Sequence, residues 1–499
     1  MNLQANPGQA HPGPQRAKCV MVLGTSSGAG KSWLATALCR HYARQGLKVA
    51  PFKAQNMSNN ARVVASPAGA GEIGSAQYFQ ALAARAEPEV RMNPLLLKPE
   101  ADTRSQVVLL GQVDTELSAM PWRGRSEKVW PRIEQALNEL RAEYDVVVIE
   151  GAGSPAEINL MASDIVNLRV ARAADASCLL VTDIDRGGAF AHLYGTWALL
   201  PEADRARIKG FVLNKFRGDA ALLAPAPEQL EQLTGVPTVA TLPMWWQHGL
   251  PEEDGVFDDR SRSAGAVSLT VAVVAYPRLS NLDEFQPLKN IPGLRLVWAR
   301  SPAELAGADW IILPGSKHSS SDLAWLREQD LDRAIADHAE QGGAVLGICG
   351  GLQMLGEALI DTHGVDGNAP GLGLLPLVTQ FDPDKTVRRT QACFGQLSGA
   401  WSALSGVAVQ GYEIHHGQTA QHPAMAAAGD IAREVLPGLA WQNPRGNVLG
   451  CYLHGLFEDP ALLQALFGAA APTLDAVFDG LADYLERHVA PGVLDALIA

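Results

Sequence analysis

The sequence predicts an α/β protein with two doubly wound parallel-sheet domains in tandem. Two observations lead to this fold class. Short runs rich in Val, Ile and Leu alternate with helix-like segments, and each run ends at Gly, Asp or Pro, as is typical of parallel strands buried on both faces. In each half of the chain, one such run meets a glycine-rich turn that opens a helix. Strands that alternate with helices in this way favour a parallel sheet.

The expected strands form two sets, on either side of a polar segment. This segment, residues 252–269, is charged and contains Gly and Ser, so we expect a domain boundary within it. We predict a tail over residues 1–17, a first domain over 18–258, a linker over 259–266, a second domain over 267–465 and a C-terminal helical segment over 466–499. The expected strands are Cys19–Leu23, Leu47–Phe52, Val146–Ile149, Cys178–Val181, Gly210–Leu213, Leu269–Ala275, Leu294–Val297, Trp310–Leu313 and Ala344–Ile348.

The overall composition argues against several classes of protein. A net charge of −13 disfavours general binding to nucleic acid or to an anionic membrane, although it permits an anionic ligand in a locally basic pocket. The six cysteines form no CxxC pair, which indicates neither a disulfide framework nor a zinc ribbon, so we expect a cytoplasmic protein. Residues 1–17 are polar and rich in Pro and Gly, which predicts a disordered tail rather than a signal peptide. No apolar run approaches the ~20 residues of a membrane-spanning helix.

The segment CVMVLGTSSGAGKSWL reads as a strand, a glycine-rich loop and the start of a helix. Backbone N–H groups in such a loop point at phosphate oxygens, and the helix N-terminus adds partial positive charge. We expect Lys31 to reach the terminal phosphates and Ser32 to bind Mg²⁺. The glycine spacing in GTSSGAGKS resembles the dethiobiotin-synthetase-like branch of phosphate-loop enzymes. The expected ATP-binding residues of this loop are Gly24, Thr25, Gly28, Gly30, Lys31 and Ser32.

Polar residues at the ends of later strands are candidates to complete this site. Because Mg²⁺ prefers oxygen ligands, Glu150 and Asp183, which each follow an apolar strand, are the expected metal-binding carboxylates. Asp185 follows closely, and the sequence alone leaves open which of the three acids holds metal and which orients substrate. Asn214 and Lys215 end another strand, where they are placed to read the purine edge of ATP.

Further polar side chains gather at the same edge of the expected first sheet. In an open parallel sheet, ligands bind beyond the carboxyl ends of the strands, so this density of amides and charges indicates a large polar substrate. The cations among them suit an anionic one. The candidate substrate-binding residues are Lys53, Gln55, Asn56, Lys98, Arg104, Asp185 and Arg186.

The run AVLGICGGLQMLG places a thiol, Cys349, on a sharp turn between a strand and a helix. Only small neighbours fit such a turn, and the helix N-terminus favours the thiolate, so Cys349 is the expected nucleophile. The N–H of Gly350 is a candidate oxyanion donor, with Gly315 of IILPGSK as the second. A base is also needed. His454 follows a predicted strand and is preferred over His415 and His416.

Together these residues resemble the triad class of glutamine amidotransferases. The shared run is the glycine-bracketed cysteine followed by Gly-x-Gln, with a histidine about a hundred residues later. The resemblance implies that Cys349 attacks the glutamine amide, His454 moves protons and Gln353 helps to hold glutamine. Most of the class has Glu two residues after the histidine, where this chain has Leu456. The third triad member is therefore open: Glu458 and Asp459 are candidates, and a further alternative is that no third member is needed.

A dethiobiotin-synthetase-like domain ahead of such a glutaminase domain resembles the cobyrinate-amidating enzymes, over nearly the whole chain after the tail. The resemblance implies a phosphate-loop NTPase-like fold followed by a class I glutamine amidotransferase-like fold, with ATP and Mg²⁺ as cofactors and glutamine as nitrogen donor. The segments PFKAQNMSNNA, EGAGSPAEINL, DIDRGGAFA, NKFRGD and GYEIHHG look like the branch of this family that acts on adenosylcobyrinic acid a,c-diamide. That branch amidates the four remaining side-chain carboxylates (b, d, e and g) in cobalamin biosynthesis.

Three alternatives remain at this point. The a,c-diamide synthase branch performs the same chemistry on two carboxylates, but KAQNMSNN argues against it. A ParA/MinD-like regulatory ATPase accounts for the phosphate loop but not for the cysteine turn. A pseudo-enzyme is suggested only by Leu456. The expected partners are the corrinoid substrate, glutamine and ATP, without nucleic acid or membrane, and the oligomeric state is left open.

Overall fold

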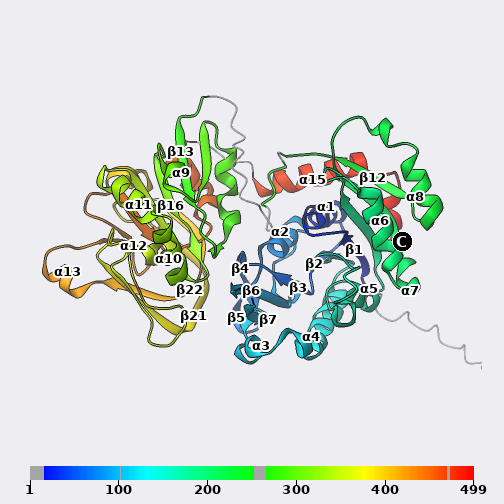
Figure 1. Cartoon of the computed structure of the whole chain (residues 1–499), viewed down its shortest axis with the longest axis horizontal. Coiled ribbons are helices and arrows are strands. Elements are labelled where there is room, and N and C mark those ends of the chain that lie inside the picture. Colours follow the sequence, from blue (N-terminus) through cyan, green and yellow to red (C-terminus); the bar gives the residue numbers. More distant parts are fainter. Residues whose placement is uncertain (1–15, 102, 247, 252–265, 469–472) are drawn as a thin grey trace, which may run out of the picture.

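A computed structural model of the chain describes residues 16–101, 103–246, 248–251, 266–468 and 473–499. Figure 1 shows two lobes, each built around a central sheet. The first lobe contains residues 16–251 and 473–499, and the second lobe contains residues 266–468. The predicted α/β class with parallel sheets is confirmed in both lobes. Residues 1–15 of the expected tail and 259–265 of the expected linker lie outside the described residues.

The central sheet of the first lobe has the strand order β12-β11-β10-β1-β9-β2, and its strands run parallel. Because β9 and β10 flank β1, their carboxyl ends lie on either side of the loop that follows β1. The strands are β1 Lys18–Gly24, β2 Val49–Phe52, β9 Val146–Glu150, β10 Ser177–Asp183, β11 Ile208–Phe216 and β12 Thr238–Pro243. The helices are α1 Lys31–Arg44, α2 Ser75–Ala83, α3 Thr115–Ala119, α4 Trp122–Glu143, α5 Leu168–Ala174, α6 Ala189–Leu199, α7 Glu202–Arg205 and α8 Ala226–Thr234.

Two small sheets between β2 and α3 face the second lobe, and the sequence did not predict them. Their strands are short and partly polar, so they lack the apolar runs that marked the central strands. One sheet contains β3 Gln55–Met57, β6 Leu95–Ala101, β7 Arg104–Leu109 and β8 Gln112–Val113. The other is a hairpin of β4 Ala61–Ser66 and β5 Gly69–Gly74, which contacts β21, Leu377–Cys393, of the second lobe.

The second lobe has a sheet in the order β15-β13-β16-β18-β25-β24-β23, in which the first five strands are parallel. These seven strands are β13 Leu269–Val274, β15 Leu294–Ala299, β16 Trp310–Leu313, β18 Ala344–Ile348, β23 Arg433–Leu436, β24 Ala440–Gln442 and β25 Val448–Cys451. A long antiparallel hairpin of β21 Leu377–Cys393 and β22 Ala408–Gln421 extends from it, with β19 Ala358–Ile360 and β20 Ala369–Pro370 alongside. The helices are α9 Pro302–Leu305, α10 Ser319–Glu328, α11 Leu331–Glu340, α12 Gly350–Leu355, α13 Pro423–Ala427 and α14 Pro460–Phe467.

The C-terminal segment returns to the first lobe. Helix α15, Leu474–His488, lies beside α1, as the red helix in Figure 1 shows, and α16 spans Val493–Ala496. The Arg40 side chain of α1 pairs with Asp475 and, at 2.9 Å, with Asp479. Phe478, Leu481 and Leu485 of α15 are buried in the same apolar cluster as the core of α1. The end of the chain therefore completes the apolar core of the first lobe.

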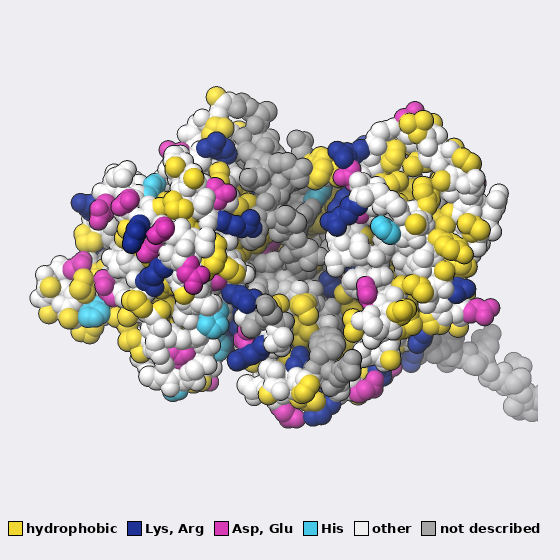
Figure 2. Space-filling view, viewed as in Figure 1, with side chains coloured by type: hydrophobic (Ala, Val, Ile, Leu, Met, Phe, Trp, Pro, Cys, Tyr) yellow, Lys and Arg dark blue, Asp and Glu magenta, His cyan; other side chains and the backbone are white. Residues whose placement is uncertain are grey.

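The surface is mixed in charge. Figure 2 shows basic and acidic side chains interspersed on the visible face of both lobes. Within the described ranges, no helix combines the length and the apolar character needed to cross a membrane.

Candidate functional site

The loop after β1 is a tight turn with a lysine folded across it. Lys31 Nζ donates to the carbonyl oxygens of Ser26 (2.9 Å) and Gly153 (3.1 Å). Gly30 has φ +102°, and a Cβ at this position would lie 2.0 Å from Asn214 Nδ2. Only glycine accepts both that backbone angle and that contact. The loop therefore presents backbone N–H groups and a lysine at the N-terminus of α1, an arrangement that suits polyphosphate.

Glu150, at the end of β9, lies beside the start of α1, where Ser32 follows Lys31. Its Oε1 accepts from Ser32 Oγ and from Lys53 Nζ, both at 2.8 Å, and its Oε2 accepts from Gln80 Nε2 at 2.6 Å. Burial raises the pKa of Glu150, but the charge of Lys53 and these hydrogen bonds outweigh burial and lower it. Glu150 is therefore an ionised carboxylate that is hydrogen-bonded to the Ser32 hydroxyl. These two side chains provide oxygen ligands of the kind that Mg²⁺ prefers.

Asp183, at the end of β10, lies on the other side of the loop. Its Oδ2 is 3.2 Å from Lys215 Nζ and 3.4 Å from Arg186 Nε. Lys215 also donates to Gly28 O at 2.8 Å, and Asn214 Nδ2 donates to Ala29 O at 2.9 Å. Two side chains at the end of β11 therefore hold the phosphate loop by hydrogen bonds to its backbone carbonyl groups.

A cavity of about 460 Å³ lies next to Lys215. It is lined by Ile184, Asp185, Phe216, Arg217 and Gly218. Arg217 Nε donates to Asp185 Oδ1 at 2.6 Å. The cavity has an apolar wall and a charged pair at the same edge of the sheet, which is a suitable place for a nucleotide base.

Two of the candidate substrate-binding residues, Lys53 and Lys98, are buried in ion pairs. Lys53 pairs with Glu150, and Lys98 Nζ lies 2.7 Å from Glu72 Oε2. Glu150 and Glu72 are themselves buried, and a buried carboxylate is stable only with a partner of opposite charge, so each lysine is buried with its carboxylate. Asn56 is also buried and donates to Gln77 Oε1 at 3.2 Å, whereas Gln55 is partly exposed. Arg104 and Arg186 are the exposed cations of the predicted set.

In the second lobe, Cys349 occupies the turn between β18 and α12 with φ +51° and ψ −104°. A positive φ is strained for a residue other than glycine, and such strain is concentrated at functional sites. The bracketing glycines have a steric cause. A Cβ on Gly351 would lie 1.9 Å from Leu313 O, and one on Gly350 would lie 2.7 Å from Ser316 N. The turn therefore closes tightly against β16 and β17, Gly315–Ser316.

His454 is fully buried and lies beside Cys349. Its Nδ1 is 3.1 Å from Glu284 Oε1, while Glu284 Oε2 accepts from Gly455 N at 2.8 Å. Burial lowers the pKa of His454, but the charges of Glu284 and of the Cys349 sulfur, which also hydrogen-bonds the ring, raise it to about 10. The three side chains form a relay of thiol, imidazole and carboxylate, the arrangement of an activated nucleophile.

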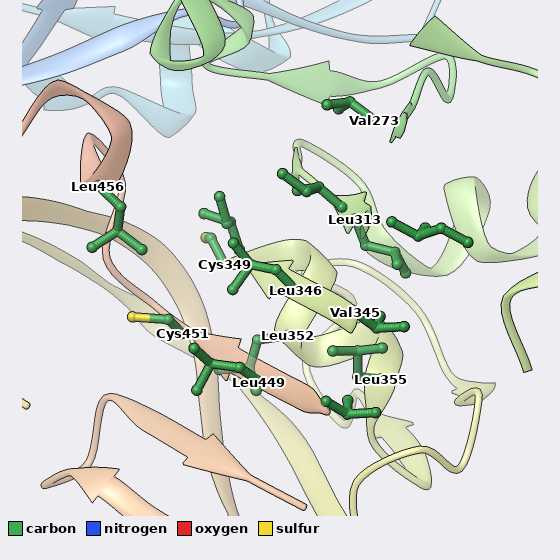
Figure 3. Close-up of a cluster of buried hydrophobic side chains, with 14 of the residues drawn as sticks. Val273, Leu313, Val345, Leu346, Cys349, Leu352, Leu355, Leu449, Cys451 and Leu456 are labelled. Carbon is green, nitrogen blue, oxygen red and sulfur yellow. The ribbon is translucent and has the colours of Figure 1, made fainter. Parts of the chain in front are cut away.

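Glu284 is the carboxylate that sequence reasoning missed, and the expectation of Glu458 or Asp459 in this role is wrong. Glu458 pairs with Arg62 at 2.5 Å, and Asp459 caps α14 by accepting from Ala461 N at 2.8 Å. Leu456 lies among the buried apolar side chains around Cys349, as Figure 3 shows. The only signal for Glu284 was a pair of acids, Asp283 and Glu284, set between apolar residues in NLDEFQ.

The remaining predicted residues of the second lobe surround this relay. A Cβ on Gly315 would lie 2.6 Å from His454 Cε1, so the backbone of Gly315 borders the imidazole. Gln353 is buried on α12, and its Oε1 accepts from Ser319 Oγ at 2.8 Å. His415 and His416 point elsewhere, since His415 contacts Glu413 and His416 Nδ1 lies 3.0 Å from Asp382 O.

Two family models match the chain and together cover both lobes. A CobQ/CobB/MinD/ParA nucleotide binding domain matches residues 20–251, and a CobB/CobQ-like glutamine amidotransferase domain matches residues 270–462. Among solved structures, a crystal structure of glutamine amidotransferase covers 40% of this chain and 99% of its own length, at 19% identity and a TM-score of 0.31.

Curated relatives match over nearly the full length. Cobyric acid synthase of Acidovorax ebreus is 78% identical over 491 residues, covering 96% of this chain and 99% of the relative. Cobyric acid synthase of Variovorax paradoxus is 79% identical over 483 residues, covering 97% and 99%. The corresponding protein of Leptothrix cholodnii is 68% identical, covering 97% of each chain. On this identity and coverage, together with the two sites described above, the chain belongs to the cobyric acid synthase family.

Proposed function

We propose that this protein amidates the b, d, e and g side-chain carboxylates of adenosylcobyrinic acid a,c-diamide, using ATP and glutamine, to give adenosylcobyric acid. The observation that carries the proposal is the presence of two complementary sites in one chain. One lobe holds a phosphate loop beside an ionised Glu150, and the other holds the relay of Cys349, His454 and Glu284. The six cysteines are free thiols, which supports a cytoplasmic location.

The second lobe is suited to release ammonia from glutamine. The Cys349 thiolate attacks the side-chain amide, and the N–H groups of Gly350 and Gly315 stabilise the oxyanion. His454, held by Glu284, gives its proton to the departing ammonia and then takes one from the water that hydrolyses the thioester. Gln353 supports the glutamine site from α12. Free ammonia is largely ammonium at neutral pH and is not nucleophilic, so its release inside the protein preserves its reactivity.

The first lobe is suited to activate the acceptor carboxylate. A carboxylate is a poor electrophile, whereas an acyl phosphate carries a good leaving group. Lys31 and the loop N–H groups would neutralise the transferring phosphate, with the purine in the cavity beside Phe216. Ser32 and Glu150 would hold Mg²⁺, which supplies charge neutralisation on the phosphates when bound. Arg104 and Arg186 are placed to attract the polyanionic corrinoid.

Product mass is the direct test of this proposal. The protein is incubated with ATP, Mg²⁺, glutamine and either adenosylcobyrinic acid or its a,c-diamide, and the added amides are counted by mass spectrometry. We expect four added amides on the a,c-diamide. Amidation of the unamidated acid at two positions, with no reaction on the a,c-diamide, would identify an a,c-diamide synthase instead. ATP hydrolysis without amidation of either corrinoid would overturn the proposal.

A further inference from the structure

We propose that Arg62, a residue of the first lobe, is a positioning residue for the glutaminase relay in the second lobe. It joins the segment that carries Glu284 to the turn that follows His454. This inference rests on the glutaminase half of the proposed function and adds a residue from the opposite domain to it.

The ion pairs of Arg62 cross the boundary between the lobes. Arg62 lies on β4, and its Nη2 donates to Asp283 and, at 2.5 Å, to Glu458 Oε1. The side chains of Arg62 and Asp283 are 2% and 1% exposed. Asp283 directly precedes Glu284, and Glu458 ends the short turn that begins at Gly455. One guanidinium therefore binds both segments that supply the imidazole and its carboxylate.

Arg62 also contacts the aromatic ring that stacks on the His454 imidazole, which is the ring of Tyr412. The Tyr412 ring stacks on His454 with centroids 5.4 Å apart, and Arg62 Cζ lies 5.1 Å from the centroid of the Tyr412 ring. The groups facing His454 are thus Glu284, Cys349 and Tyr412, while Arg62, Asp283 and Glu458 form the next layer. A shift of Arg62 would therefore displace both the segment that carries Glu284 and the Tyr412 ring, which contact the imidazole at different positions.

Residues next to Arg62 fix its position with hydrogen bonds. Asn60 Oδ1 accepts from Leu282 N at 2.9 Å, and Ala61 N donates to Asn281 Oδ1 at 3.0 Å. The same stretch of chain begins at Lys53, which binds Glu150 beside the phosphate loop. Residues 53–62 therefore run from the nucleotide site to the glutaminase relay, and Arg62 stands at the end of this connection.

The chemistry of the contact requires arginine. Asp283 and Glu458 are two carboxylates close to a third, Glu284, and without a cation their mutual repulsion would push these segments apart. Both carboxylates contact one guanidinium nitrogen, Nη2, whose position is fixed by the rigid plane of the group and by the aromatic rings packed against it. The ammonium of lysine is a point charge on a flexible stem and has no such plane to hold it. Arg62→Lys therefore keeps the positive charge but loses the fixed placement of that charge between Asp283 and Glu458.

The test compares Arg62→Lys and Arg62→Ala with Arg389→Ala in the full-length protein. Arg389 is the matched control, because its side chain also crosses between the lobes, to Val63 O at 3.1 Å and to Glu87, but does not contact the relay segments. Glutamate release gives kcat, KM and the pH profile of the glutaminase. Amidation supported by ammonia measures the other site, and near-ultraviolet circular dichroism verifies folding.

For Arg62→Lys we expect kcat for glutamine hydrolysis to fall about tenfold with KM within about twofold, since a positioning group acts on the reacting atoms more than on binding. The alkaline limb of the profile should move to lower pH as Glu284 loosens from His454. Ammonia-supported amidation should stay within about twofold of the unaltered protein. Arg389→Ala should leave all three readouts unchanged.

The inference is overturned if Arg62→Lys leaves both kcat and the alkaline limb in place, or if Arg389→Ala lowers kcat as much. If Arg62→Ala does not fold, the kcat and the pH profile of Arg62→Lys still test the positioning role of Arg62. Failure of the unaltered protein to amidate any corrinoid would refute the proposed function, while glutamate release would continue to test Arg62 independently.

Discussion

Both active regions are built at the turn between a central parallel strand and a helix, yet the two turns distribute strain differently. In the turn between β1 and α1, the residues with positive φ are Gly28 and Gly30, which carry no side chain. In the turn between β18 and α12, the residue with positive φ is Cys349 itself. The phosphate loop therefore has its positive φ angles at glycines, which adopt them without strain, whereas the cysteine turn is strained at the proposed nucleophile itself.

The two regions also differ in where their essential carboxylate originates. Glu150 ends β9, the sheet neighbour of β1, so the topology of the sheet alone brings it beside the loop. Glu284 comes from η4, Leu282–Asn290, a short helix outside the sheet, and that segment is tied to the first lobe by Arg62. The nucleotide site is thus complete within its own sheet, while the glutaminase relay depends on a contact between the lobes.

The largest expected effect separates the two nitrogen sources. Cys349→Ser should lower glutamine-dependent amidation by about 10⁴-fold or more, because the nucleophile is lost, while amidation with added ammonia should persist. The measurement is amide formation by mass spectrometry with each nitrogen source. If ammonia also fails to support the variant, the separation of the two sites is wrong. Cys393→Ser, which changes an exposed cysteine far from the turn in sequence, is the control.

Lys31→Ala should remove the activity of the other site. Without the lysine charge on the transferring phosphate, we expect amidation from glutamine and from ammonia to fall together, by about 10³-fold. ATP consumption should fall in parallel in a coupled assay. Glutamate release without ATP should be nearly unchanged, since Lys31 contacts the phosphate loop and Gly153 rather than the relay. Unchanged ATP turnover would contradict the assignment of the phosphate loop.

Much of the fold was predictable because parallel strands buried on both faces carry a local signal. The runs over Val146–Ile149 and Ala344–Ile348 are apolar throughout and became β9 and β18. The strands β3 to β8 and the long hairpin of β21 and β22 were missed, because their burial depends on the neighbouring lobe or on one face only. Residues 382–393 of β21, for example, are half-buried or exposed, and the sequence there is largely polar.

The site residues divide in the same way. Lys31, Ser32 and Cys349 were predicted because each belongs to a motif of adjacent residues, whereas His454 was predicted from its position after a strand and from the family resemblance. Glu284 lies 170 residues from His454 along the chain and belongs to no local motif, so only the folded structure pairs them. Lys53 and Lys98 were placed at the rim because the sequence could not show that Glu150 and Glu72 would be buried next to them.

Glu284→Gln tests the relay through its pH dependence, and we expect a loss of about 10²-fold in glutaminase kcat/KM near neutral pH. Burial lowers the pKa of His454, but Glu284 and the Cys349 sulfur together raise it to about 10, so the imidazolium of the unaltered protein persists until the pH approaches that value. Without the Glu284 charge, only the Cys349 sulfur opposes burial, so the pKa of His454 falls and the alkaline limb should move to lower pH. The loss should therefore be larger at alkaline than at acid pH.

The profile of glutamate release against pH gives this shift directly. Asp459→Asn is the matched control, because Asp459 lies close to His454 in sequence but caps α14. Its alkaline limb should stay in place. A limb that moves in the Asp459 variant and not in the Glu284 variant would show that the relay has been assigned to the wrong acid.

Gly30→Ala should have the smallest effect and sharpens the comparison of the two turns. Its Cβ would meet Asn214 Nδ2, which must then release Ala29 O, and its φ of +102° adds backbone strain. Gly46→Ala is the control, because Gly46 also has a positive φ, +84°, but its Cβ would meet nothing within 4 Å. We expect the KM for ATP to rise about tenfold in the first variant and to stay unchanged in the second, with each losing about 1 kcal/mol of stability. Equal KM values in the two variants would show that ATP binding depends neither on the backbone angle of Gly30 nor on its contact with the end of β11.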